Sequence, residues 1–245
     1  MSDASSALNA SRPRRPAHPP ASVDQPVREV LFAFVAVTAA VSMLYRARTI
    51  AFIDRNLAVI AAVLFLYVPA WILWRRGRDL DQYGLRMAPL ARGIGLMLAS
   101  GAVVLPLFAV GYYWFVHRGC PAVARLIPTL HCSPSLSLAL RPPPDFAMAT
   151  LSQLLVVALP EEFFFRGFMQ GRLGEVMKPG RALPLTALLF ALGHYLVTFQ
   201  PASLAVFFPG LLFGLLRHAT GSVLAGTLFH AACNLFMEVL HRSVG

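Results

Sequence analysis

Charged side chains are scarce in this sequence, and their scarcity decides which class of protein it encodes. Asp, Glu, Lys and Arg make up 13% of the 245 residues, whereas a soluble domain of this size carries about a quarter. The shortfall is concentrated in apolar runs of about 20 residues, the length that crosses the hydrocarbon core of a bilayer as a helix. The pattern excludes a soluble globular domain and predicts an all-α, polytopic membrane helix bundle.

Acidic residues are the scarcer of the charged residues. The chain has 11 Asp and Glu against 21 Lys and Arg, which gives a net charge of +10. In a soluble protein this excess would indicate a nucleic-acid partner. Here the basic residues flank apolar runs, and no aromatic-basic groove or nucleic-acid motif accompanies them, so we interpret them as determinants of membrane topology. We expect the bilayer as a partner and no nucleic acid.

Several catalytic and metal-binding motifs are also absent. The three cysteines, Cys120, Cys132 and Cys233, show no CxxC spacing, which excludes a zinc knuckle or a thioredoxin motif. The HExxH motif of zinc proteases is missing. No Ser or Cys stands as an evident nucleophile beside a base, and we interpret Cys233 as a packing residue. Cys120 and Cys132 are compatible both with a disulfide and with two free thiols.

The chain divides into three parts. Residues 1–26 form a basic, Pro-rich tail that cannot pack a core and is expected to be disordered. Residues 27–144 hold the N-terminal transmembrane helices and an external loop, and residues 145–245 hold a second helix bundle that carries the chemistry. The apolar runs predict about seven transmembrane helices, at residues 29–45, 56–74, 93–116, 145–174, 182–199, 203–217 and 222–241.

The distribution of Arg and Lys predicts the orientation of these helices. With the N-terminus inside, the inner segments carry about thirteen basic residues and the outer segments about seven, in agreement with the positive-inside rule. The predicted location is a bacterial inner membrane, because the Arg- and Ala-rich composition is typical of bacteria, with the N-terminus in the cytoplasm. The loop 117–145, which contains Cys120 and Cys132, then lies outside.

A group of polar residues interrupts three of the last four apolar helices. Helix 145–174 contains Glu161, Glu162 and Arg166, and later helices contribute three more polar residues, His194, His230 and Asn234. Glu162 and Arg166 are four residues apart and can pair on one helix face, as can His230 and Asn234. Charges in the bilayer interior cost several kcal/mol, so such residues face a bundle interior and have partners. Counting along the helices places them at one depth, roughly 12 to 20 Å from the inner ends.

This set of residues has the parts needed to hydrolyse a peptide bond without a covalent intermediate. A carboxylate and an imidazole together can hold and deprotonate a water molecule. A His and an Asn side chain can donate hydrogen bonds to an oxyanion. Zinc bound by Glu161, His194 and His230 is a conceivable alternative, but Asn234 and Arg166 suit the stabilisation of an anion better than a zinc site. We therefore expect no metal or other cofactor.

Three motifs, in this order on successive apolar helices, resemble the CPBP family of CAAX prenyl endopeptidases and bacteriocin-processing or Abi-type enzymes, the glutamate-type intramembrane proteases. They read Glu161-Glu162-x-x-x-Arg166, Phe190-x-x-x-His194 and His230-x-x-x-Asn234. The resemblance covers residues 145–240. It implies that Glu161 is the general base, that His194 helps to activate the water, and that His230 and Asn234 form the oxyanion site. It also implies that Glu162 and Arg166 orient the cluster, with Glu162 as a second candidate for the catalytic load.

The sequence leaves the substrate open. The resemblance implies a membrane-anchored or lipidated protein or peptide, with or without a prenyl group. Some bacterial relatives process C-terminal sorting segments, in which a membrane helix follows a small motif. A different class of function is also open, because a transporter or a bacteriocin-immunity protein can use the same buried charges as a proton relay or binding site. Against a transporter, the sequence shows no inverted repeat and no paired broken helices.

Overall fold

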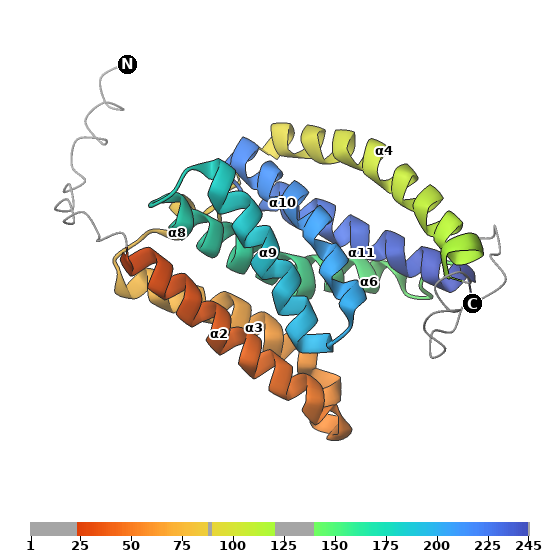
Figure 1. Cartoon of the computed structure of the whole chain (residues 1–245), viewed down its shortest axis with the longest axis horizontal. Helices are drawn as coiled ribbons and strands as arrows, with labels where there is room; N and C mark the ends of the chain where they lie inside the picture. The colour runs from red at the N-terminus through yellow and green to blue at the C-terminus, as the bar shows by residue number, and fades with distance from the viewer. Residues whose placement is uncertain (1–23, 88–89, 121–139, 245) are drawn as a thin grey trace, which may run out of the picture.

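The computed structural model describes residues 24–87, 90–120 and 140–244, and within them the chain is helical, without β-strands. Seven long helical segments follow one another along these residues (Figure 1). They confirm the predicted all-α bundle of seven helices, and each predicted range overlaps one of them. In chain order the segments are α2 (Asp24–Arg46), α3 (Ala51–Arg75), α4 (Leu90–Trp114) with η3 (Phe115–Gly119), a helix spanning Phe146–Gly174, α9 (Pro179–Thr198), η6 (Pro201–Val206) with α10 (Phe207–Thr220), and α11 (Leu224–Val244).

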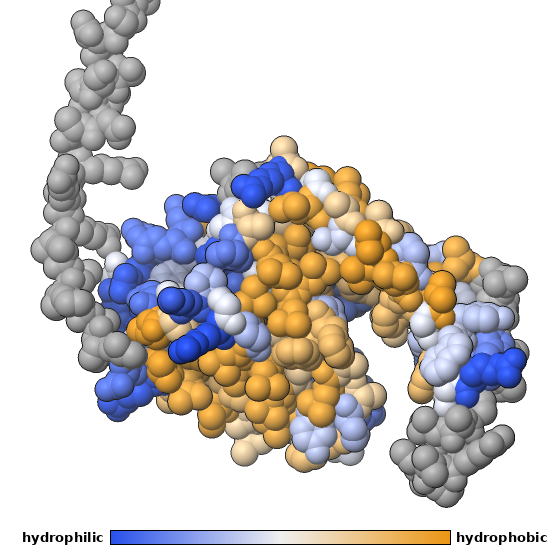
Figure 2. Space-filling model, turned by 45° about the horizontal axis from the view of Figure 1, so that its top comes forward, coloured by the Kyte–Doolittle hydropathy of each residue, from blue (hydrophilic) through white to orange (hydrophobic). Residues whose placement is uncertain are grey.

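The segments are long and apolar enough for an integral membrane protein. Six of those that the structure describes meet the length and hydropathy expected of a membrane span, and α11 is the segment that falls outside this group. α11 is 21 residues long but carries His230, Asn234 and Glu238. Its inner face is covered by α10, α4 and the helix 146–174. Figure 2 shows an apolar surface over the middle of the molecule, with hydrophilic residues gathered at the left end and on the arm at the right.

The first helix begins earlier than its apolar residues indicate. α2 starts at Asp24, so Asp24, Gln25 and Pro26 are helical although composition assigned them to the tail. An acidic residue in the first turn interacts favourably with the helix dipole, and proline is tolerated there because its missing N–H has no intrahelical partner. Composition detects neither effect. The rest of the predicted tail lies outside the described residues.

The helix 146–174, here called the central helix, is the axis of the bundle. It contacts α2, α3, α9, α10 and α11, and α2 also packs against α3 and α9. All seven consecutive residues from Phe163 to Met169 are buried, so the helix is enclosed around its whole circumference. The Phe163, Phe164 and Phe165 side chains therefore pack within the bundle and do not face lipid.

The central helix is not a regular α-helix. Two π-helical stretches, η4 (Gln153–Ala158) and η5 (Phe163–Met169), flank the short α-helical piece α7 (Leu159–Glu162), and α6 (Phe146–Ser152) and α8 (Gln170–Gly174) complete the helix. In η4 the Leu159 N–H donates to the Leu154 carbonyl, five residues back. Pro160, which has no N–H to donate, follows directly. Such π-bulges are rare and occur frequently at functional sites, and here they lie on both sides of Glu161 and Glu162.

A network of ion pairs fixes the end of the bundle where α2 begins. The Arg172 guanidinium is buried and lies 2.6 Å from Glu29 Oε2 of α2 and 2.7 Å from Glu175 Oε2. Arg76, at the end of α3, binds the other oxygen of Glu29 at 2.8 Å. The Tyr83 hydroxyl, in η2 (Leu80–Tyr83), donates to Glu175. Burial and this carboxylate raise the pKa of Tyr83 to about 12. The network ties α2, α3 and η2 to the central helix.

The cysteines differ in state. Cys120, directly after η3, is disulfide-bonded, and Cys233 on α11 is a free thiol. Cys132 lies outside the described residues. The disulfide alternative of the sequence analysis therefore holds for Cys120.

Candidate active site

The buried pair predicted from the i, i+4 spacing is present in the central helix. Arg166 Nη1 donates to Glu162 Oε1 at 3.0 Å, and the two side chains are 1% and 0% exposed. The other guanidinium nitrogen, Nη2, donates to the Gly210 carbonyl of α10 at 3.1 Å. A Cβ atom on Gly210 would lie 3.1 Å from this Nη2 atom, so a side chain there would require the guanidinium to move by a few tenths of an ångström. The pair joins two helices in the protein interior.

Two aromatic rings enclose Arg166 and His230. The Arg166 guanidinium carbon lies 4.2 Å from the centre of the Phe190 ring and 5.2 Å from that of Phe213. The His230 imidazole stacks on Phe213, with 4.7 Å between ring centres and 17° between the planes. Phe190 meets His194 edge-on at 4.5 Å. Rings on α9 and α10 thus hold the Arg166 guanidinium by packing and cation–π attraction, and they hold the two imidazoles by ring packing.

Glu162 also orients His230. His230 Nδ1 lies 3.0 Å from Glu162 Oε1, the oxygen that accepts from Arg166. Because this oxygen accepts the Arg166 hydrogen bond, Nδ1 is the donor and carries a proton. The other ring nitrogen, Nε2, then points toward Glu161, with 3.9 Å between Nε2 and Glu161 Oε2. An imidazole held through one nitrogen by a carboxylate has a fixed tautomer and ring orientation.

His194 is oriented in a similar way by the backbone. Its Nδ1 lies 3.0 Å from the Phe190 carbonyl oxygen, which can only accept, so Nδ1 carries the proton. When only Nδ1 carries a proton, Nε2 is an acceptor, and it lies 3.9 Å from Glu161 Oε2. The spacing of Phe190 and His194, one helical turn, makes this hydrogen bond possible within α9.

Glu161 lies between the two histidines. Its Oε2 atom is 3.9 Å from Nε2 of both His194 and His230, and it has no hydrogen-bond partner among the described residues although it is buried. A buried oxygen of this kind calls for a polar ligand. Exposure rises from 0% for Glu162 to 16% for Glu161 and 33% for His194. The cluster therefore has a closed back and an open front, and Glu161 and His194 are at the front.

Asn234 lies one turn along α11 from His230, as the HxxxN spacing predicts. Its Nδ2 atom donates to Gln153 Oε1 at 2.9 Å, which fixes the orientation of the amide. Asn234 does not bind the carboxylates. It faces the same cavity as Glu161 and His230.

A largely apolar cavity of about 550 Å³ opens in front of the cluster. Glu161, His194, His230 and Asn234 are among the residues that line it, and most of the others are apolar side chains from α4, η6, α10 and α11, among them Leu105, Phe108, Val206, Phe208, Leu212, Phe236 and Met237. Figure 2 shows the surface hollowed between the main body and an arm that corresponds to the ends of α4 and α11 in Figure 1. A concave apolar site with a few convergent polar groups is typical of a ligand or substrate site.

The comparisons with known proteins concern the segment that holds these residues. Residues 143–236 match the family model described as type II CAAX prenyl endopeptidase Rce1-like. This segment is Rce1-like. It contains all six predicted site residues, and the match confirms the resemblance to the CPBP family and supports a membrane-bound peptidase. Comparison with curated proteins and with solved structures gave no match.

The Rce1-like segment does not have the geometry of a zinc site. Two ligands of a tetrahedral zinc ion, with bonds of 2.0–2.1 Å, lie about 3.3 Å apart, whereas the Glu161 oxygen is 3.9 Å from each imidazole nitrogen. Within the described part of the chain, no group of three or more His, Cys, Asp or Glu side chains is arranged to hold a metal ion. We therefore derive no step through zinc.

Sequence reasoning missed Gln153 and Gly226. Gln153 is an amide within a predicted membrane helix of the Rce1-like segment, eight residues before Glu161, and an amide in such a helix was the available signal. Gly226 brings the α11 backbone against Glu162, since a Cβ atom there would lie 2.9 Å from Glu162 Oε2. No pattern in the sequence indicates this approach, because it depends on how α11 packs against the central helix.

Proposed function

We propose that this protein is an intramembrane glutamic endopeptidase of the CPBP type, which hydrolyses a peptide bond of a membrane-anchored or lipidated protein. One observation carries the proposal. A buried carboxylate oxygen of Glu161 faces the unbonded nitrogens of two oriented imidazoles at the end of a membrane-embedded apolar cavity. This arrangement suits the activation of a water molecule.

In the proposed reaction the first step is attack by water. The water donates one hydrogen bond to Glu161 Oε2 and one to Nε2 of His194. Glu161 takes a proton from the water, and the water oxygen forms a bond to the carbonyl carbon of the substrate. The resulting tetrahedral intermediate carries a negative charge on the former carbonyl oxygen. No covalent bond to the enzyme forms, so no Ser or Cys nucleophile is required.

The oxyanion is stabilised by His230 and Asn234. His230 donates through Nε2 when both ring nitrogens are protonated, and Glu162 stabilises this cation through its contact with Nδ1. Asn234 has a second N–H on Nδ2 besides the one bound to Gln153. Donors of this kind in a site shielded from water contribute strongly to catalysis. The C–N bond then breaks, and Glu161 returns its proton to the leaving nitrogen.

Glu162 and Arg166 are positioning residues in this proposal. An isolated carboxylate at this depth would cost several kcal/mol, and Arg166 compensates it through a direct bond. With Glu161 and Glu162 ionised and Arg166 and His230 protonated, the cluster is electrically neutral. The neutral balance supports a water-activating site that is stable in an apolar interior.

The apolar cavity supports a substrate that arrives from the bilayer. Its walls suit a hydrocarbon chain or an apolar peptide segment next to the scissile bond, and its polar groups lie at one end. A prenylated protein and a protein with a C-terminal sorting helix both have this character. We propose a membrane-anchored protein with a C-terminal processing segment, because the predicted bacterial origin favours it over a prenylated protein.

We infer that the protein lies in a bacterial inner membrane with its N-terminus in the cytoplasm. The distribution of basic residues predicts this orientation. The disulfide at Cys120 supports it, because Cys120 follows the outer end of α4 in this topology and disulfides persist in oxidising compartments.

The test uses purified full-length protein in vesicles with three substrates. The first has a C-terminal transmembrane segment, the second ends in a prenylated cysteine motif, and the third is the second without its prenyl group. Product masses give the cleaved bond, and a parallel series contains a zinc chelator. The proposal predicts cleavage of the first substrate at an unchanged rate with chelator. Cleavage of the prenylated substrate alone would show that the substrate class is wrong. Loss of activity with chelator would contradict the metal-free mechanism. Binding of all three substrates without cleavage would favour an immunity-type binding protein.

A further inference from the structure

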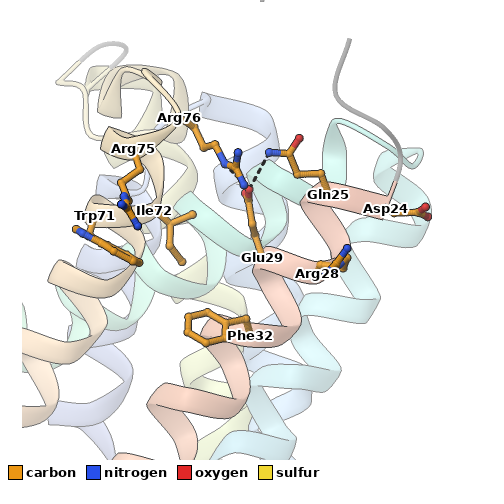
Figure 3. Close-up of a pocket in the computed structure, with 9 residues that line it drawn as sticks. All are labelled: Asp24, Gln25, Arg28, Glu29, Phe32, Trp71, Ile72, Arg75 and Arg76. Atoms are coloured by element: carbon orange, nitrogen blue, oxygen red, sulfur yellow. Dashed lines mark hydrogen bonds and ion pairs between the residues drawn. The ribbon is translucent and has the colours of Figure 1, made fainter. Parts of the chain in front are cut away.

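A second cavity lies apart from the catalytic cluster, at the end of the bundle where α2 begins and α3 ends. Its volume is about 790 Å³, and it is lined by residues of the first turns of α2 and the last turns of α3 (Figure 3). None of the six candidate catalytic residues contributes to it. Neither the Rce1-like match nor the proposed reaction gives this cavity a role, because both concern the segment from residue 143 onward.

The cavity has an excess of positive charge. Arg28, Arg75 and Arg76 line it, with Asp24 and Glu29 as the acidic residues. Glu29 is already bound by Arg76 and by buried Arg172, at 2.8 and 2.6 Å, so its charge is compensated. In Figure 3 the Asp24 carboxylate points away from Glu29 and the α3 side chains.

Two of the arginines are available for a ligand. Arg28 and Arg75 are exposed, and neither forms an ion pair within the described residues. Arg75 stacks on the Trp71 ring with 4.8 Å between the guanidinium carbon and the ring centre, which holds it at the cavity. An anion would complete these contacts.

The apolar residues of the cavity lie deeper in the membrane than the arginines. Phe32 is one turn below Arg28 on α2, and Trp71 is one turn below Arg75 on α3, a difference of roughly 6 Å. Their side chains are 60% and 48% exposed. Figure 3 shows Trp71 and Phe32 on the two walls, with Ile72 between them. The cavity is therefore cationic at the helix ends and apolar toward the bilayer centre, and Trp is enriched at this interface.

We propose that this cavity binds an acidic phospholipid of the inner leaflet. Arg75 on α3 and Arg28 on α2 supply the cationic groups that attract its headgroup from the two walls, and the beginning of an acyl chain lies along Phe32 and Trp71. Basic pockets between transmembrane helices on the cytoplasmic side bind anionic headgroups by this chemistry. A free phosphate ion would bind the arginines but would leave the aromatic side chains exposed to water. A phospholipid has a group for each part of the cavity, because its phosphate pairs with the arginines and its acyl chain covers the aromatic side chains.

The experiment measures lipid binding to the purified full-length protein by native mass spectrometry. Phosphatidylglycerol, phosphatidylcholine and inorganic phosphate are titrated separately, and phosphate is then added as a competitor of phosphatidylglycerol. We expect phosphatidylglycerol to bind at least tenfold more tightly than phosphatidylcholine. Arg28→Gln combined with Arg75→Gln should weaken phosphatidylglycerol binding roughly 30-fold, about fivefold for each arginine. Arg28→Lys combined with Arg75→Lys keeps the charge and should retain most of the preference.

The control is Arg92→Gln combined with Arg181→Gln. These exposed arginines begin α4 and α9 at the same end of the bundle, and the change in net charge is the same. The proposal requires this variant to bind phosphatidylglycerol like the wild type. Equal binding of the two lipids, or equal losses in the control and the cavity variant, would overturn it. Displacement of phosphatidylglycerol by millimolar inorganic phosphate would overturn the lipid as the ligand and identify a small-anion site.

Discussion

At the scale of single residues, the site depends on one oxygen atom. Glu162 Oε1 accepts from Arg166 Nη1 and from His230 Nδ1, both at 3.0 Å. It therefore joins the charge-compensating pair to the imidazole that faces Glu161. Because all three side chains are almost completely buried, water cannot replace a lost partner. Stability and catalysis are coupled at this atom.

This coupling predicts the effect of Arg166→Met. The substitution leaves the Glu162 carboxylate buried with only His230 as a partner, so we expect a loss of about 3–5 kcal/mol in the free energy of unfolding. Glu162→Gln combined with Arg166→Met removes both charges and should be less destabilised than the single variant. Denaturation in mixed micelles measures all three proteins. A loss below about 1 kcal/mol for Arg166→Met would show that the pair is not compensating a buried charge.

Gln153 provides a second residue-scale prediction. Its Oε1 atom orients the Asn234 amide and has no contact with Glu161. Gln153→Ala should therefore lower kcat by roughly tenfold with little change in KM, a smaller effect than the ~10²–10³ lost with an oxyanion donor itself. Thr150→Ala is the control on the same helix, since its hydroxyl bonds only its own backbone at Phe146. Equal effects of the two substitutions, or a change confined to KM, would exclude a positioning role.

At the scale of elements, the site depends on the irregular central helix and on the close packing of α11 against it. The two π stretches flank the glutamates, and Gly226 lets the α11 backbone approach Glu162. A bulkier residue at position 226 would push the two helices apart. The distances from Glu161 to His230 and from Glu162 to His230 would then both increase, because His230 is on the next turn of α11.

Gly226→Ala tests this packing. The new Cβ atom would lie 2.9 Å from Glu162 Oε2, in the protein interior, and we expect a destabilisation of about 1–3 kcal/mol together with reduced cleavage. The matched control is Gly95→Ala on α4, where nothing lies within 4 Å of the added atom. That substitution should be neutral or slightly stabilising, since alanine favours a helix over glycine by roughly 0.5–1 kcal/mol. Thermal unfolding of both variants in detergent is sufficient, and a neutral Gly226→Ala would refute the close approach.

At the scale of the whole molecule, the proposed topology has consecutive helices crossing the membrane in opposite directions. Thr49 lies between α2 and α3, at the end opposite to Lys178, which precedes α9. In the predicted topology Thr49 is outside and Lys178 is inside, and both are exposed. In a variant without the native cysteines, a cysteine at Thr49 should react with an impermeant maleimide in intact cells. A cysteine at Lys178 should react only after permeabilisation, and the reverse pattern would invert the proposed orientation.

The sequence predicted the bundle because hydropathy and helix length are local properties. It also predicted a group of polar residues that the structure brings together around Glu161 and Glu162, since helical spacing determines how far along its helix each residue lies. It could not predict that Glu162, rather than Glu161, binds His230 Nδ1, because that depends on the rotation of α11 against the central helix. The π stretches and the contact of Gln153 with Asn234 likewise depend on tertiary packing. The start of α2 at Asp24 was missed because a favourable dipole interaction leaves no apolar pattern.

The most direct test of the central claim compares three proteins on one cleavable membrane-anchored substrate. They are the wild type, Glu161→Gln and Glu238→Gln, in which the control removes an α11 carboxylate that pairs only with Arg242. If Glu161 is the general base, Glu161→Gln lowers the cleavage rate at least about 10²-fold, while Glu238→Gln keeps the wild-type rate and all three proteins unfold at similar temperatures. Cleavage by Glu161→Gln at a rate near that of the wild type would contradict the account.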